Sequence, residues 1–170
     1  MKTTNENQLR RKIRRWIILF IVFLVLSGVT AFPLETELSF LNEHAGWMPL
    51  MLREWLGSMY ASIKDVNAHH PQLSYGTDWL AFAHLVIATA FIGPLQDPVR
   101  NIWVIRFGMI ACLMVFPLAF ICGPIREIPF FWRLIDCSFG VFGFIPLYLC
   151  YRNIQQLEIL TSKNSAHEKE

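Results

Sequence analysis

The chain has 170 residues, of which 54% are hydrophobic and only 16% are charged, and its formal net charge is +2. A soluble domain contains about 25% charged residues and, at this size, buries only about two-thirds of the surface that its unfolded chain exposes. The composition therefore excludes an ordinary soluble domain and indicates one domain that uses lipid as part of its solvent.

Four apolar runs predict the spanning helices of an all-α, polytopic membrane protein. Each run is close to the roughly 20 residues that a helix needs to cross about 30 Å of hydrocarbon. A helix also satisfies its own backbone hydrogen bonds, which lipid cannot do. We therefore predict a bundle of four transmembrane helices, at about 16–34, 79–95, 102–122 and 130–151.

Six of the fifteen basic residues precede the first apolar run. A basic segment can bind nucleic acid, but directly beside a span it is typical of a topology signal. With the N-terminus in the cytoplasm, the inner side holds eleven Lys and Arg residues and the outer side holds four. We therefore expect a protein of the plasma (inner) membrane with both termini cytoplasmic and no nucleic-acid partner.

Glycine and proline mark the ends of the later spans. Gly93-Pro94 closes the second, and Asp97-Pro98 is expected to open the third as an N-cap followed by proline. Gly123-Pro124 ends the third span, and Pro129 starts the fourth. Connections this short make spans two, three and four antiparallel neighbours.

The long segment after the first span contains one predicted helix, at about 48–66. Apolar residues recur there at helical spacing, and charged residues occupy other positions. The pattern predicts an amphipathic helix that lies on the outer bilayer surface or caps the bundle. Residues 1–157 would form the membrane domain, and the polar residues 158–170 a flexible cytoplasmic tail. The apolar stripe consists of Leu52, Trp55, Leu56, Met59, Ile63 and Val66.

Ionisable residues inside spans are costly, so each is a candidate functional residue. His84 lies about two turns into the second span and Asp136 about two turns into the fourth, counted from the same outer face. We expect them at similar depth and close together. They are the candidate catalytic residues, with His84 as acid/base oriented by Asp136.

The candidate ligand-binding residues form a wider set around this pair. Two readings without a ligand also remain open. His84 and Asp136 could form a hydrogen bond that only fastens two helices, or Arg133 could form an intrahelical ion pair with Asp136. The ligand-binding set is Thr77, Asp78, His84, Arg133 and Asp136.

The sequence predicts no metal site and no cofactor. His44, His69 and His70 lie in the outer loop without ligand-type spacing, and we interpret them as exposed histidines. The four cysteines lie in apolar runs, where cysteine behaves as a small hydrophobic residue. A Cys122–Cys137 bridge remains open.

The layout resembles the EXPERA group, the family of emopamil-binding protein and the sigma-2 receptor. The matching features are Phe82-Ala83-His84-Leu85-Val86 followed by Pro94, then Phe116-Pro117 and Ile145-Pro146. That family binds lipophilic cations or carbocations with buried carboxylates. This sequence departs from the pattern by having His84 where one carboxylate would align. The resemblance implies a lateral pocket for a lipophilic molecule, with Asp136 as its acid.

The leading hypothesis is an integral membrane protein that binds a lipophilic molecule or a partner's helix at a polar spot in the outer half of the bundle. One alternative is an intramembrane enzyme that acts on a lipid or isoprenoid. Another is a non-catalytic subunit of a membrane assembly, which includes a homo-oligomer. In the subunit reading, the polar residues only fasten helices.

The charge asymmetry gives a topology prediction. Single cysteines introduced at Ser58 and Ser165 should react with a thiol label from the outside and from the inside, respectively. The measurement is accessibility labelling in sealed membranes. Labelling of both positions from the same side would contradict the four-span arrangement.

Overall fold

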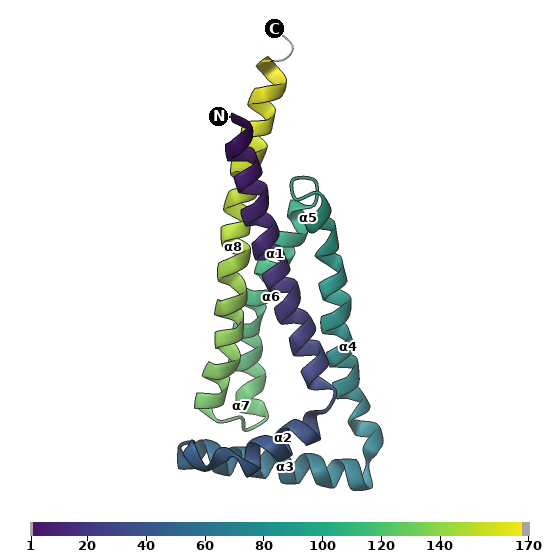
Figure 1. The fold of residues 1–170 in the computed structure, drawn as a ribbon. Helices are drawn as coiled ribbons and strands as arrows, with labels where there is room; N and C mark the ends of the chain where they lie inside the picture. Colours follow the sequence, from purple (N-terminus) through teal and green to yellow (C-terminus); the bar gives the residue numbers. More distant parts are fainter. Residues whose placement is uncertain (1, 168–170) are drawn as a thin grey trace. The chain divides into compact units, whose positions relative to one another are not determined.

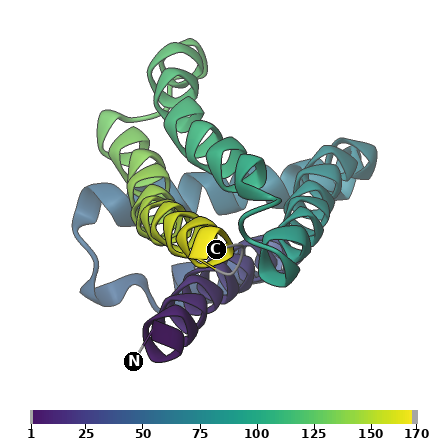
Figure 2. The same cartoon turned by 90° about the horizontal axis from the view of Figure 1, so that it is seen from above.

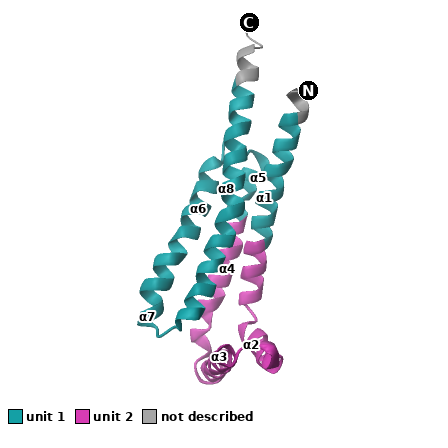
Figure 3. Cartoon of the chain, turned by 90° about the vertical axis from the view of Figure 1, so that its left-hand side faces the viewer, with its two compact units in different colours: residues 1–22, 89–170 teal, residues 23–88 magenta. Residues whose placement is uncertain are grey.

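The structure is a computed structural model that describes residues 2–167 as helices joined by short turns, without a strand in that range. The chain divides into unit 1, residues 1–22 and 89–170, and unit 2, residues 23–88 (Figure 3). The described residues include four helices long and apolar enough to cross a membrane, as predicted. They are Asn5–Ala31, Pro71–Gln96, Ile102–Ile125 and Phe130–Ser162.

In unit 1, the first part of α1 (Lys2–Ala31) lies beside α8 (Phe130–His167), as Figures 1 and 2 show. Both helices continue beyond their apolar runs, because buried residues at helical spacing extend along each of them. α8 therefore continues as a helix beyond Tyr151, the predicted end of the fourth span, and past Glu158, where the predicted flexible tail begins. The buried residues are Leu9, Ile13, Ile17 and Phe20 in α1, and Leu147, Cys150, Ile154 and Leu157 in α8.

α6 (Ile102–Pro117) and α8 pack closely as antiparallel neighbours in unit 1. Glycines make the close approach possible. A Cβ atom at Gly140 would lie only 2.7 Å from the carbonyl oxygen of Cys112, and one at Gly108 only 2.8 Å from Leu147 Cδ1. Small residues at helix crossings let backbones approach in this way.

Two prolines lie where an apolar segment divides into separate helices. Pro94 has no N–H to donate to Ala90, and the second apolar segment divides there into α4 (Tyr75–Ala90) and α5 (Ile92–Gln96). α6 ends at Pro117. The chain then continues as a π-helical turn, η3 (Leu118–Cys122), and as the short helix α7 (Gly123–Ile125). Removal of a donor from the ladder favours this local change of register.

The predicted N-cap at Asp97 is wrong. α6 begins at Ile102 and has Asn101 at its N-cap position. The Asp97 carboxylate instead accepts a hydrogen bond from the Arg100 N–H at 3.1 Å, within the turn that precedes the helix. An Asp-Pro pair favours a turn as well as a helix start, so the motif alone does not separate the two.

Unit 2 contains a hairpin of α2 (Leu34–Glu43) and α3 (Leu50–His69), joined through η1 (Ala45–Trp47). α3 is the helix predicted at about 48–66, and its place on the outer bilayer surface or as a cap on the bundle stays a prediction. α2 was not predicted. Within the apolar stripe Leu56 is buried and its other members are half-buried, because the stripe packs on α2. A second short turn, η2 (Pro71–Leu73), leads into α4.

The glycine contacts give a stability prediction. Gly140→Ala should destabilise the protein by about 1–3 kcal/mol, because the new methyl group meets backbone rather than a movable side chain. Gly76→Ala is the matched control, since nothing lies within 4 Å of its Cβ position. Thermal unfolding in detergent micelles measures both. Equal melting temperatures for the two variants would contradict the close packing of α6 on α8.

Candidate functional site

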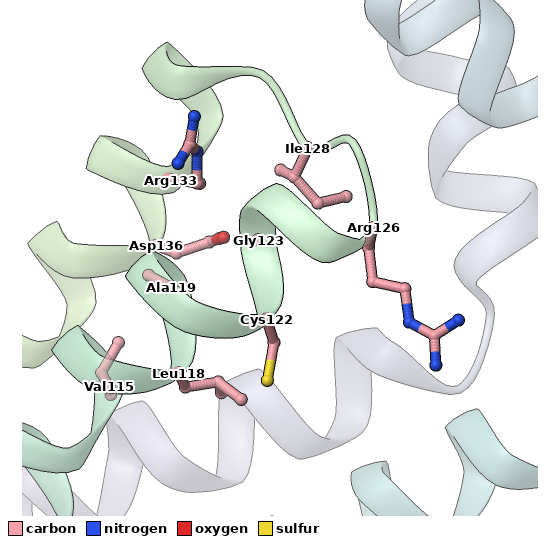
Figure 4. A pocket seen from close by; sticks show the side chains of 9 residues that line it. All are labelled: Val115, Leu118, Ala119, Cys122, Gly123, Arg126, Ile128, Arg133 and Asp136. Atoms are coloured by element: carbon pink, nitrogen blue, oxygen red, sulfur yellow. The ribbon is translucent and has the colours of Figure 1, made fainter.

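Unit 1 contains a cavity of about 230 Å³ where the π-helical turn and α7 meet the first turns of α8 (Figure 4). Much of its wall is apolar, and charged side chains from α8 and the α7–α8 turn complete it. We call it the arginine cavity. Its lining residues are Val115, Leu118, Ala119, Cys122, Gly123, Arg126, Ile128, Arg133 and Asp136.

Local backbone structure holds this cavity in shape. Three of its lining residues, Leu118, Ala119 and Cys122, come from the π-helical turn, which is wider than an α-helical turn. The turn that follows is tight, since the Ile128 N–H donates to the Gly123 carbonyl at 2.9 Å. Glu127 adopts a φ of 55° to close it, a conformation that is strained for a residue with a side chain.

Arg133 is the most constrained charged residue of the cavity. Its aliphatic stem packs over Gly123, where even a Cβ atom would collide with Arg133 Cδ. Its guanidinium lies 5.3 Å from the centre of the Phe130 ring. The Nε atom is buried and has no hydrogen-bond partner among the described residues. A buried donor without an acceptor is unfavourable, and more so when it carries charge.

Asp136 lies one helical turn from Arg133 and points toward the Gly123 turn (Figure 4). An intrahelical ion pair between Arg133 and Asp136 is not formed in the described part of the chain. The structure thus brings together two of the predicted ligand-binding residues in one cavity but leaves their charges unpaired.

Two further predicted residues, Thr77 and Asp78, line a different cavity, of about 220 Å³, in unit 2. It lies where the start of α2, the end of α3 and the start of α4 converge. The Asn67 side chain bridges these elements, because its Nδ2 donates to Glu35 Oε2 at 2.6 Å and its Oδ1 accepts from Ser74 Oγ. We call this the asparagine cavity.

His84 is not among the residues that line either cavity. In unit 2 it lies at the crossing of α4 with the end of α1, where a Cβ atom at Gly28 would lie 3.2 Å from His84 Cβ and 2.8 Å from the Ala81 carbonyl oxygen. His84 Nδ1 lies 2.8 Å from the Leu80 carbonyl, which can only accept. Nδ1 therefore donates this hydrogen bond, which fixes the orientation of the ring.

The expected contact between His84 and Asp136 stays a prediction. His84 belongs to unit 2 and Asp136 to unit 1, and each unit is defined by itself. The orienting acceptor for His84 within unit 2 is a backbone carbonyl rather than a carboxylate.

Two of the three outer-loop histidines have local partners. His44 Nδ1 lies 2.8 Å from the Phe40 carbonyl, and His69 pairs with Asp65 at 3.1 Å. No group of three or more potential metal ligands occurs within the described residues. All four cysteines are free thiols, so the Cys122–Cys137 bridge is not formed.

Sequence reasoning missed several lining residues. Cys122 and Arg126 line the arginine cavity because the chain turns after Pro117. A proline inside an apolar run was the sequence feature that could have indicated this turn. Glu35 and Asn67 join the asparagine cavity although 32 positions separate them. No sequence spacing indicates that pairing, because it depends on how α2 folds back on α3.

No protein-family model, curated protein or solved structure matches the chain. The resemblance to the EXPERA group therefore rests on the layout of the sequence alone.

The asparagine network gives a third prediction. Asn67→Asp should weaken the junction of α2, α3 and α4 by about 1–3 kcal/mol, because it replaces a donor to Glu35 with a second carboxylate. Hydrogen exchange of Leu34–Glu43 should become faster. Gln72→Glu adds the same charge at an exposed position and serves as the control. Unchanged exchange in α2 for the Asn67 variant would show that this hydrogen bond does not hold the junction.

Proposed function

We propose that the chain is an integral membrane protein whose four apolar helices form a bundle, with both termini on the cytoplasmic side of the plasma (inner) membrane. Its large exposed apolar side chains support insertion. Phe139 is 68% exposed, Phe142 66% and Met114 63%. Exposure of such large apolar side chains is unfavourable in water but not in lipid hydrocarbon. The proposed orientation follows the distribution of Lys and Arg.

We propose that this protein binds an amphiphilic, lipid-like molecule in the arginine cavity. The observation that carries the proposal is the buried Nε of Arg133, a charged donor without a partner in a largely apolar cavity. A ligand with an acceptor would satisfy that donor and would cover the apolar wall at the same time. Ligand sites commonly combine mostly apolar linings with a few convergent polar groups.

The size and position of the cavity fit part of an amphiphile rather than a whole soluble ligand. Its volume of about 230 Å³ is below the roughly 300–1,000 Å³ typical of sites for drug-sized molecules. In the proposed orientation the cavity lies at the outer ends of α6 and α8, where lipid head groups meet hydrocarbon. The exposed side chain of Leu118 at its wall leaves a route for a chain to continue into lipid.

Photolabelling tests this function. The probes are traces of phosphatidylethanolamine and phosphatidylglycerol with a diazirine in one acyl chain, in phosphatidylcholine vesicles that contain the protein. Labelling of Val115, Leu118 and Ala119 should saturate as the probe fraction rises, because a site fills. Labelling of the exposed Phe139 and Phe142 face should rise in proportion, because bulk lipid covers it.

Two tryptophan variants provide the control. Leu118→Trp should fill the mouth of the cavity and reduce the saturable labelling several-fold. Leu113→Trp places the same side chain at another exposed leucine of the same apolar segment, outside the cavity, and should leave labelling unchanged. Proportional labelling everywhere, or equal loss in both variants, would contradict a lipid-binding cavity.

A further inference from the structure

We infer that the arginine cavity selects an amphiphile with a terminal oxyanion, a hydroxyl donor about one helical turn deeper, and then a single acyl chain. This is the chemistry of a monoacylglycerol phosphate. The inference rests on the function proposed above and names the ligand class for that same site. It follows from the order in which charged, polar and apolar groups succeed one another along α8.

The outermost part of the cavity favours an anion. Arg133 and Arg126 stand on either side of the Gly123 turn in Figure 4. Arg133 is held there by its stem over Gly123 and by the Phe130 ring, so its guanidinium is oriented before a ligand arrives. Guanidinium groups bind phosphate and carboxylate oxygens through several N–H donors at once. The unpartnered Nε–H of Arg133 is one such donor.

The middle of the cavity favours a hydrogen-bond donor. Asp136 follows Arg133 by three residues, a rise of about 4.5 Å along the helix. It has no ion pair with either arginine within the described residues. An anion alone would leave the Asp136 carboxylate facing negative charge. A ligand that places a hydroxyl one turn below its phosphate would donate to Asp136 and remove that conflict.

The deepest part of the cavity is apolar. Val115 lies beside Gly140, one turn beyond Asp136, with its Cβ 3.4 Å from the Gly140 Cβ position. Ala119 completes this part of the wall, and the exposed Leu118 borders the opening of the cavity to lipid. An acyl chain would contact these residues without leaving a polar group unsatisfied. From the start of α8 inward, the cavity therefore offers contacts for an oxyanion, then for a hydroxyl donor, and then for an acyl chain.

Three single-chain probes separate these elements in native mass spectrometry of the 170-residue chain. The first is an acylglycerol phosphate. The second is the acylpropanediol phosphate of the same chain length, which lacks only the hydroxyl. The third is the monoacylglycerol, which lacks only the phosphate. We expect the first to be retained at least about tenfold better than either other probe, because each comparison removes at least one charge-assisted hydrogen bond.

Variants assign each element to its residue. Arg133→Gln should reduce retention of the phosphate probe to that of monoacylglycerol. Asp136→Leu should abolish the difference between the two phosphate probes. Arg152→Gln removes a charge from α8 outside the cavity and should change neither ratio. The ligand-side deletions keep the test informative even where a variant does not fold.

The outcomes also separate this inference from the proposed function. Equal retention of the two phosphate probes, with loss in the Leu118→Trp variant, would overturn the donor selection while the lipid site stands. Equal retention of the phosphate probe and monoacylglycerol would overturn the oxyanion assignment in the same way. If Leu118→Trp changes the retention of none of the three probes, the proposed function itself would be overturned.

Discussion

The close approach of α6 and α8 is the contact on which unit 1 depends. A glycine at 140 lets the α8 backbone reach the Cys112 carbonyl of α6, and Gly108 accommodates Leu147 further along the same antiparallel pair. This register places Val115 beside Gly140 and therefore sets the π-helical turn opposite the first turns of α8. The arginine cavity is the space that remains where the two helices stop fitting so closely.

Pro117 shapes the end of the α6–α8 contact from within the third apolar segment. Because it cannot donate a backbone hydrogen bond, the helix after it changes register and widens. The widened turn then needs a tight reversal, which Glu127 completes with a positive φ. A strained turn costs free energy, and strained backbone is found more often at functional sites than elsewhere. Here it borders Arg133, the residue that the proposed ligand would satisfy.

The two cavities illustrate how polar groups near apolar helices divide between structure and binding. In the asparagine cavity, Asn67 has both of its functions occupied, by Glu35 and Ser74, and the network joins three helices. In the arginine cavity, Arg133 Nε and Asp136 have no such partners among the described residues. A satisfied network rigidifies a junction, whereas unsatisfied groups on a fixed frame are available to a ligand.

The sequence by itself determined the all-helical fold, the four long apolar helices and the amphipathic α3. Apolar content and periodicity are local properties of the sequence, and they decide which segments form helices and which face of each helix is apolar. It also gave Arg133 and Asp136 as candidate ligand-binding residues, because a charge within an apolar run can be recognised from the sequence alone. Both residues line the arginine cavity. Only the tertiary structure separated them from Thr77 and Asp78, which line another cavity, and joined Asn67 to Glu35. These pairings depend on helix crossings, which glycines and prolines set through contacts between residues far apart in the chain.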